Sequence, residues 1–217
     1  MTDMTVARSH MIDCQLRPNE VNDERLIAAI RRVPRELFVP KAKRSVAYVD
    51  EDIEVAAGRY LMEPMIFARL LVAADIQPSD AVLDVGCATG YSTAVMAGLA
   101  EAVVALEADR KLAALAEKTL AALEIVNVAV VEGRHADGVE GQGPFDVIFV
   151  GGAVEEIPAR LLDQLADGGR LVCVRDTGGV GRAHLVVRDG QLMAGRDLFD
   201  ASVPPLPGFA RPAAFVF

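Results

Sequence analysis

The stretch VLDVGCATGYST, residues 82–93, combines residue types that can hold a small ligand. An apolar run carries Asp84, and two glycines, Gly86 and Gly90, bracket the turn that follows. A second acid, Glu107, closes the next apolar run, AVVALE. Parallel sheets bind ligands at the carboxyl ends of their strands, so both acids are expected at one ligand-binding edge.

The residues that the turn lacks narrow the choice of ligand. A P-loop requires a lysine after its last glycine, and Gly90 is followed by Tyr91. A dinucleotide fingerprint GxGxxG that starts at Gly86 meets Ala88 and Tyr91 where glycines are required. A nucleoside triphosphate is therefore not expected, and a dinucleotide is the weaker alternative.

S-adenosylmethionine is the ligand that fits the remaining features. It needs close approach of the chain, which Gly86 and Gly90 permit, and an acid that accepts from its ribose hydroxyls. Glu107 stands where that acid is needed, and Asp84 can orient the loop or the ammonium group of the donor. The structural alternative is that the turn is an ordinary one and that Glu107 caps the helix starting at Asp109.

The elements that must position these residues alternate from residue 80 onward. Strands are expected at 81–85, 102–107, 128–132, 145–150, 170–175, 183–192 and 213–217, and helices at 89–100, 109–124 and 155–166. This alternation predicts an α/β fold with a doubly wound, mostly parallel seven-stranded sheet and helices on both faces, a Rossmann-like arrangement. A proline-rich loop is expected at 203–208.

The first 78 residues have a different pattern. Helical spacing of apolar residues predicts helices at 23–33 and 63–76, and the remainder of the first 60 residues is expected to be helix and loop. We therefore divide the chain into an N-terminal helical segment, 1–78, and an α/β domain with the C-terminal strands, 79–217. The two are expected to form one compact unit.

Composition excludes several classes of protein. Hydrophobic residues make up 52% of the 217 residues, and the net charge of −9 argues against a general nucleic-acid binder. A local basic cluster at 31–44 is expected to be solvated. Three cysteines without a CxxC motif suggest neither a disulfide framework nor a metal site. With no apolar run long enough for a membrane span or a signal peptide, a cytoplasmic protein without membrane partners is expected.

Ordered motifs along the chain connect it to a known family. They are RVPRELFVP (32–40), AYVDEDIEV (47–55), VLDVGCATGYSTA (82–94), PFDVIFVGGAVEEIPARLLDQLADGGRLV (144–172) and a closing FVF. On these motifs the chain from about residue 8 resembles the protein-L-isoaspartate O-methyltransferases, which are class I S-adenosylmethionine-dependent enzymes.

The resemblance implies a reaction and its partners. The expected reaction is methyl esterification of the α-carboxyl of L-isoaspartyl residues in damaged proteins, with S-adenosylhomocysteine as product and the N-terminal segment covering the substrate. A carboxylate is already nucleophilic at neutral pH, so no general base is required. Catalysis would come from positioning in a site that excludes water.

The resemblance also assigns site residues. The acceptor is expected beside Arg59, Tyr60, Leu61 and Glu63, with Met62 at the position of the family's catalytic serine. The donor is expected on Asp84, Gly86, Cys87, Ala88, Thr89, Gly90, Tyr91, Glu107, Ala108, Gly133, Arg134 and His135.

Two of these positions depart from the family pattern. Met62 replaces a hydroxyl with a thioether, which cannot donate a hydrogen bond, and Arg134 replaces an aspartate that accepts from the adenine amino group. For Arg134, the backbone could hold the adenine, the guanidinium could stack on it, or Asp137 could substitute. The alternatives are therefore a methyltransferase with another acceptor, such as a small carboxylate or another small molecule or a specific protein carboxylate, or a donor-binding protein without activity.

Overall fold

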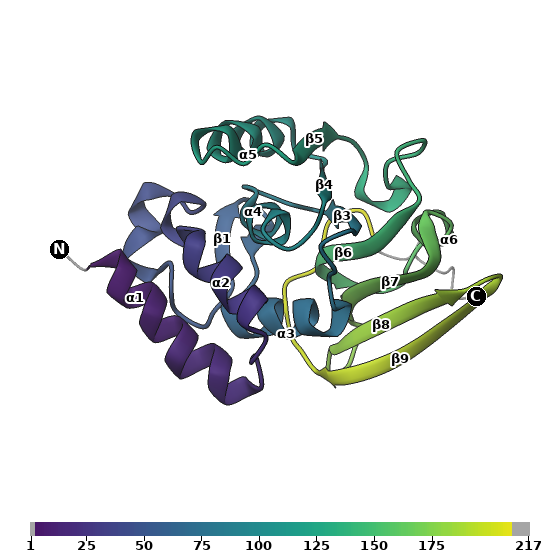
Figure 1. Ribbon diagram of the computed structural model, residues 1–217, viewed down its shortest axis with the longest axis horizontal. Helices are drawn as coiled ribbons and strands as arrows, with labels where there is room; N and C mark the ends of the chain where they lie inside the picture. Colours follow the sequence, from purple (N-terminus) through teal and green to yellow (C-terminus); the bar gives the residue numbers. More distant parts are fainter. Residues whose placement is uncertain (1–2, 210–217) are drawn as a thin grey trace, which may run out of the picture.

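The computed structural model describes residues 3–209, and its centre is one seven-stranded sheet (Figure 1). The strands are β3 (Ala81–Val85), β4 (Ala102–Glu107), β5 (Val128–Glu132), β6 (Phe145–Val154), β7 (Leu165–Arg175), β8 (Arg182–Asp189) and β9 (Leu192–Asp200). Their order in the sheet is β5-β4-β3-β6-β7-β8-β9. The first five strands in this order, β5, β4, β3, β6 and β7, run parallel to one another. β8 and β9 are antiparallel to their neighbours. The predicted mostly parallel, seven-stranded sheet is confirmed.

The last strand of this sheet differs from the expected one. The strand predicted at 183–192 is a hairpin in which β8 ends at Asp189 and β9 begins at Leu192. Gly190, at φ 58°, opens the two-residue turn between them, which favours glycine. The seventh strand is therefore β9, and the predicted strand at 213–217 lies outside the described residues.

The helices that pack near the sheet are α3 (Pro64–Ala74), which belongs to the N-terminal segment, α4 (Tyr91–Ala97), α5 (Arg110–Ala122) and α6 (Ala159–Leu162). The first three match the expected positions, but the prediction of a helix over 155–166 is wrong, because only four residues are helical. Tertiary pairing overrides the helical spacing: the amide of Phe145 donates to the carbonyl of Gln164 at 2.8 Å, and Leu165 already pairs with β6.

The N-terminal segment consists of short helices and a hairpin. It contains α1 (Met4–Met11), a helical continuation over Ile12–Leu16 and Arg17–Asn19, α2 (Glu24–Arg32), single 3₁₀ segments at Arg35–Leu37 and Lys41–Val46, and the strands β1 (Ile53–Ala56) and β2 (Arg59–Leu61). The β1–β2 pair was not expected, since loop was predicted there. In Figure 1, α1 and α2 lie at the opposite end of the molecule from the β8–β9 hairpin.

Alternate residues of the central strands supply two apolar layers. Val82, Val147 and Val172 belong to the layer under α3 and α4, while Leu83 and Ile148 belong to the layer under α6 and the loop segments. The first layer includes residues from Met11 to Val203 and so joins the N-terminal segment to the sheet. The boundary at 78/79 stays a prediction.

Within residues 3–209, no helix has the length and apolar character needed to cross a membrane. Within the same range, no group of three or more His, Cys, Asp or Glu side chains is arranged to hold a metal ion.

Candidate functional site

The glycine turn lies at the point where the sheet changes direction. β3 has β4 on one side and β6 on the other, and the chain continues outward from each. In open α/β sheets, ligands bind in the crevice outside the carboxyl ends of the strands at such a switch point. The structure therefore places the turn where a ligand site is expected.

The turn itself uses three left-handed residues. Gly86, Ala88 and Gly90 have φ values of 79°, 49° and 93°. A Cβ on Gly90 would lie 3.1 Å from the Cβ of Ala116, so this glycine allows α4 to approach α5. The amides of Gly86 and Cys87 both donate to the carbonyl of Leu106, at 2.8 and 3.2 Å, which attaches the turn to the end of β4.

Asp84 connects the turn to the helix that follows it. Its carboxylate is fully buried, and Oδ2 accepts from the hydroxyls of Ser92 (2.7 Å) and Thr93 (2.6 Å) in the first turn of α4. Oδ1 has no hydrogen-bond partner within the described residues. Burial raises the pKa of Asp84 to about 6, against the lowering effect of the two hydroxyls. Asp84 thus orients the turn and keeps one acceptor oxygen available.

Glu107 is held by three backbone amides. It is fully buried, and Oε2 accepts from the amide of Ala88 in the turn at 2.8 Å. Oε1 accepts from the amides of Ala108 (2.9 Å) and Asp109 (3.1 Å). The side chain of Asp109 caps α5. Glu107 therefore supports the turn and the residues that lead into α5, but the cap of α5 is Asp109, whereas the structural alternative expected Glu107.

Two side chains from distant segments also contact Glu107. Arg59, on β2, places Nη2 2.7 Å from Oε2 and 3.0 Å from the carbonyl oxygen of Gly86. His135 places Nε2 3.3 Å from Oε1. Burial alone would raise the pKa of Glu107, but His135, Arg59 and the amide of Asp109 more than offset it and lower the pKa to about 2. Glu107 is therefore a stabilised anion.

The segment expected to meet the acceptor runs along β2 into α3. Met62 is 7% exposed, and its carbonyl accepts from the guanidinium of Arg35 at 2.8 Å. Tyr60 and Met62 both line two small cavities of about 10 and 20 Å³, and Leu61 borders the second. Arg35 is fully buried, contrary to the expected solvated cluster at 31–44, because it binds the backbone of this segment.

Glu63 stands at the start of α3 within a group of acids. Its amide donates to Asp52 Oδ1 at 2.9 Å. Partial burial, followed by the charges of Asp52, Asp50 and Glu51, raises the pKa of Glu63 to about 7. This carboxyl group therefore titrates near neutral pH.

Four of the expected donor residues have other roles in the structure. The hydroxyl of Thr89 donates to the carbonyl of Phe38 at 2.6 Å, and the ring of Tyr91 packs edge-on against Phe38, so both attach the N-terminal segment. Cys87 is buried and borders the cavity of about 20 Å³. Gly133 is hydrogen-bonded through its amide to the carbonyl of Glu107 at 3.0 Å.

Arg134 and His135 separate at the end of β5. The side chain of Arg134 is 85% exposed and forms an ion pair with Asp137 at 3.6 Å. His135 is buried, and its Nδ1 lies 3.1 Å from the carbonyl oxygen of Pro207. The structure thus brings His135 to Glu107 and leaves Arg134 at the surface.

The segment predicted as a proline-rich loop completes the site. Residues 203–209, called the C-terminal strap, cross the carboxyl edge of the sheet. Leu206 donates its amide to the carbonyl of Ala153 at 2.8 Å, and the amide of Ala153 donates to the carbonyl of Pro204 at 3.0 Å. A Cβ on Gly86 would lie 2.6 Å from Leu206 Cδ1. An apolar residue inside the proline run was the one sequence signal for this role.

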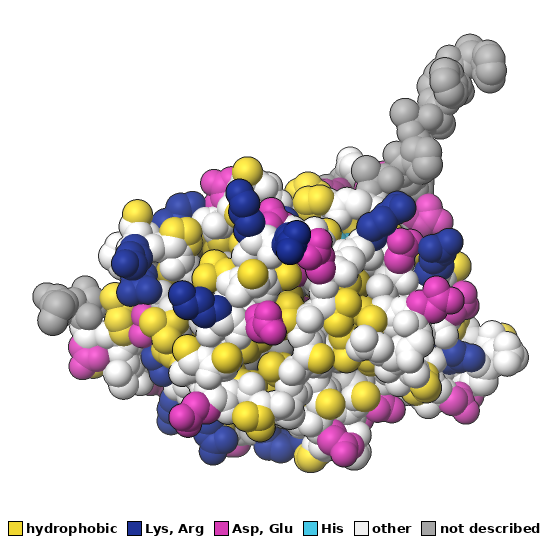
Figure 2. Space-filling model, turned by 90° about the horizontal axis from the view of Figure 1, so that it is seen from above, with side chains coloured by type: hydrophobic (Ala, Val, Ile, Leu, Met, Phe, Trp, Pro, Cys, Tyr) yellow, Lys and Arg dark blue, Asp and Glu magenta, His cyan; other side chains and the backbone are white. Residues whose placement is uncertain are grey.

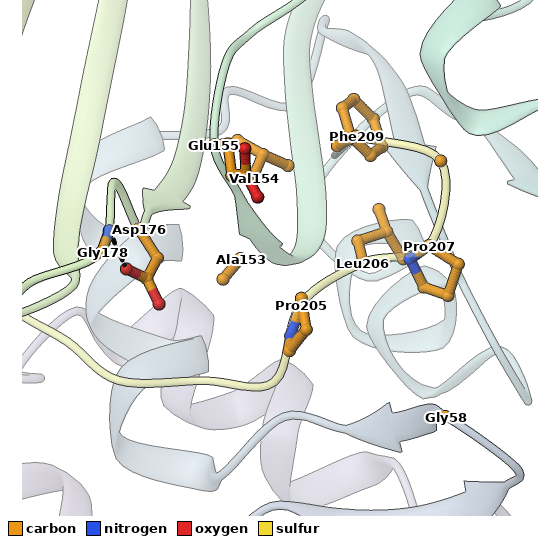
Figure 3. A pocket seen from close by; sticks show the side chains of 11 residues that line it. Gly58, Ala153, Val154, Glu155, Asp176, Gly178, Pro205, Leu206, Pro207 and Phe209 are labelled. Atoms are coloured by element: carbon orange, nitrogen blue, oxygen red, sulfur yellow. Dashed lines mark hydrogen bonds between the residues drawn. The ribbon is translucent and has the colours of Figure 1, made fainter. Parts of the chain in front are cut away.

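An open cavity of about 520 Å³ lies beside the strap. Figure 3 shows Pro205, Leu206, Pro207 and Phe209 of the strap on one side, and Val154 and Glu155 at the end of β6 across from them. Gly58 of the β1–β2 turn borders the same space.

The chemistry of these residues fits S-adenosylmethionine, but the space around the turn does not. Glycines, an acid with an unpartnered oxygen and a second acid at the next strand end are all present. However, the two cavities that border the turn and the Arg59 segment are about 10 and 20 Å³, whereas ligand pockets typically measure roughly 300 Å³ or more. Arg59 contacts both Glu107 and the carbonyl of Gly86, and Leu206 lies over Gly86.

By sequence, this chain is similar to one family model and to relatives that share one name. The sequence model described as Protein-L-isoaspartate(D-aspartate) O-methyltransferase matches residues 7–195. A Protein-L-isoaspartate O-methyltransferase of Koribacter versatilis is 38% identical over 172 residues, 79% of this chain and 78% of that protein. One of Methanoculleus marisnigri is 39% identical over 165 residues, 76% of this chain and 75% of that protein.

Solved structures agree with this grouping. A protein-L-isoaspartate O-methyltransferase structure superposes with a TM-score of 0.81 at 26% sequence identity. The match covers 93% of this chain and 66% of that chain, which is just under two thirds of its length. A Plasmodium falciparum structure in complex with S-adenosyl-L-homocysteine has a TM-score of 0.80 at 19% identity over 96% of this chain and 100% of that one, and supports the fold. On the family match and these relatives, the chain belongs to the protein-L-isoaspartate(D-aspartate) O-methyltransferase family.

Proposed function

We propose that this protein is an S-adenosylmethionine-dependent methyltransferase that esterifies the α-carboxyl of L-isoaspartyl residues in damaged proteins. The observation that carries the proposal is the family match over residues 7–195, which includes the turn with Asp84 and Glu107 at the switch point of the sheet. Relatives with this name are 38–39% identical over about three quarters of their length.

The reaction does not require a general acid or a general base from the protein. The bound donor supplies an electrophilic methyl group, and the acceptor carboxylate is already a nucleophile. The residues of this chain then contribute binding, orientation and the exclusion of water. Asp84 orients the turn, Glu107 is kept ionised as an acceptor, and the buried side chains of Met62 and Phe149 supply apolar surface beside the turn.

The cavity beside the strap supports a peptide as the acceptor. At about 520 Å³ this open cavity has room for part of a peptide, and the proline, leucine and phenylalanine side chains on one side can pack against its apolar groups. It reaches Gly58, next to the Arg59–Glu63 segment. In this proposal Arg59, Tyr60, Leu61 and Glu63 border the path from the cavity to the donor.

A second candidate is the same reaction on another carboxylate, supported by Met62. Its side chain is almost fully buried beside both small cavities, so it offers a thioether where a hydroxyl would offer a hydrogen-bond donor. A site without a hydroxyl at this position suits an acceptor that needs fewer hydrogen bonds from the protein.

The test is transfer of labelled methyl from S-adenosylmethionine to an isoaspartyl peptide, run beside its normal aspartyl twin. Base-labile label on the isoaspartyl peptide alone supports the proposal. If neither peptide is labelled while a control methyltransferase is active in the same buffer, the isoaspartyl acceptor is excluded and other carboxylates become the substrates to test.

We also propose that the protein works in the cytoplasm and without a nucleic-acid partner. Three cysteines, an odd number, suit a reducing compartment. The net charge of −9 disfavours binding to phosphate backbones. On the face shown in Figure 2, basic and acidic side chains of the described residues are interspersed.

A further inference from the structure

The groups expected to recognise the donor are already hydrogen-bonded to side chains of the chain itself. Arg59 donates to Glu107 Oε2 at 2.7 Å and to the carbonyl of Gly86 at 3.0 Å. On the other carboxylate oxygen, Oε1 accepts from the amide of Ala108 at 2.9 Å and lies 3.3 Å from His135 Nε2. Ribose hydroxyls can therefore reach Glu107 only where Arg59 or His135 withdraws.

The space that glycine leaves over the turn is filled in the same way. A Cβ built on Gly86 would meet Leu206 Cδ1 at 2.6 Å and Arg59 Nη2 at 3.3 Å. Both side chains are buried, and the backbone of Leu206 is hydrogen-bonded to Ala153 at the end of β6. Leu206 and the strap lie beyond residues 7–195, which the family sequence model matches.

The contact of Arg59 with Glu107 is incompletely satisfied. Arg59 is 6% exposed, and its two hydrogen bonds both come from Nη2. Its Nε is buried without a partner within the described residues. A buried ion pair offsets its desolvation only when the remaining donors are also bonded, so this one is a candidate for displacement by a ligand.

We propose that Arg59 is an internal competitor of the donor, an inference that rests on the proposed function. In the closed arrangement its guanidinium takes the place of the ribose hydroxyls on Glu107 and of a donor group on the carbonyl of Gly86. Donor binding requires Arg59 to leave Glu107 and the strap to lift Leu206 from Gly86. The apparent affinity for the donor is then lowered by the fraction of molecules that are closed.

The test is the affinity for S-adenosylhomocysteine, measured by calorimetry on four proteins. Arg59→Gln removes the competing charge, and Leu206→Ala clears the space over Gly86 while keeping Arg59. Arg182→Gln is the matched control, since it removes an exposed arginine that pairs with Asp200 at 3.3 Å on the β8–β9 hairpin. Thermal unfolding of each protein, alone and with S-adenosylhomocysteine, shows that it is folded.

The expected result is binding about tenfold tighter or more in Arg59→Gln and in Leu206→Ala, with Arg182→Gln equal to wild type. Equal or weaker binding by both variants, with measurable binding by wild type, overturns the role of Arg59. Should Arg59→Gln not fold, Arg59→Met removes the same charge and decides in its place. If none of the four proteins binds S-adenosylhomocysteine, the donor-dependent function itself is overturned. That outcome is distinct from one in which wild type binds and the variants show no increase in affinity, which overturns only the role of Arg59.

Discussion

The charge of Glu63 changes near neutral pH. Its pKa is raised to about 7, first by burial and then by Asp52, Asp50 and Glu51. The folded chain thus holds this proton more tightly than the unfolded chain, in which the pKa of the Glu63 side chain is 4.5. The free energy of unfolding contributed by Glu63 is fully present below about pH 4.5 and is lost as the pH rises through about 7.

Replacing Glu63 with Gln should remove this pH dependence. Asp84, with a pKa raised to about 6, acts in the same direction, so over the interval from about pH 6 to 7 it is the difference between wild type and Glu63→Gln that reports on Glu63. Urea unfolding across this interval should show a falling free energy of unfolding in wild type and a flatter one in Glu63→Gln. Glu117→Gln, an exposed change on α5, is the control and should follow wild type. Equal slopes in Glu63→Gln and wild type would contradict the assignment.

Met62→Ser tests the missing hydroxyl. A regained hydrogen bond to the acceptor is worth about 0.5–1.5 kcal/mol, so kcat/KM on an isoaspartyl peptide should rise by up to about tenfold. Truncation of this buried side chain also lowers stability, and the assay is therefore run well below the Tm of the variant. Met193→Ser, on the exposed surface of β9, should leave kcat/KM unchanged. A fall in Met62→Ser would show that the thioether serves the present acceptor.

At this scale the sequence predicted the acids but not their partners. Asp84 and Glu107 each end or nearly end an apolar run beside a recognisable turn, so local spacing was sufficient. The contact of Arg59 with Glu107 spans 48 positions, and that of His135 with Pro207 spans 72. Local periodicity carries no information about such pairs, which depend on how the strap and the β1–β2 hairpin fold back onto the sheet.

Among the elements, the strap depends on a close approach at Gly152. A Cβ there would lie 3.0 Å from Leu206 Cβ and 3.1 Å from the carbonyl oxygen of Pro204. Gly152→Ala should therefore push the strap off the end of β6, since overpacking typically costs about 1–3 kcal/mol.

The measurement for Gly152→Ala is amide hydrogen exchange at Ala153 and Leu206, whose hydrogen bonds join strap and strand. Exchange there should accelerate by roughly tenfold or more, while amides of β3 stay unchanged. Gly179→Ala is the control, because a Cβ at that position meets nothing within 4 Å. Unchanged protection of both amides in Gly152→Ala would show that the strap tolerates the added methyl group.

Helices and strands could be predicted where the periodicity of apolar residues alone determined them. Strands β3 to β6 and helices α3 to α5 follow clear periodicity, and their bounds differ from the predicted ones by a few residues at most. The region 155–166 follows helical spacing too, but Gln164 is drawn into the β6–β7 ladder and its side chain donates to the carbonyl of Asp137 at 2.9 Å. The β1–β2 hairpin carries no strong alternation and was therefore missed.

For the whole molecule, Phe67 joins the N-terminal segment to the sheet. Its ring packs against Tyr91 at 5.5 Å and Phe149 at 5.6 Å between centroids, and it is buried. Phe67→Ala should lower the free energy of unfolding by about 3–5 kcal/mol, since it removes a large ring from a packed layer. Val72→Ala, on the exposed side of the same helix, is the control and should change it by less than about 1 kcal/mol.

Denaturant unfolding of both variants, followed by far-ultraviolet and tyrosine signals, also tests the division at 78/79. One coincident transition in Phe67→Ala would support the prediction of a single compact unit. Two separated transitions would mean that residues 1–78 and the sheet unfold independently, and the prediction of one unit would be wrong.

β9 is the last strand in the order of the sheet, so within the described residues one row of its backbone amides and carbonyls has no neighbouring strand. Such an edge can template pairing with another chain. Here the strand carries Arg196, Asp197 and Asp200, whose charges resist stacking of a second copy. Exchanging Arg196 and Asp197 for valine would leave a long, exposed β-prone stretch, and the protein would then be expected to aggregate in concentrated solution.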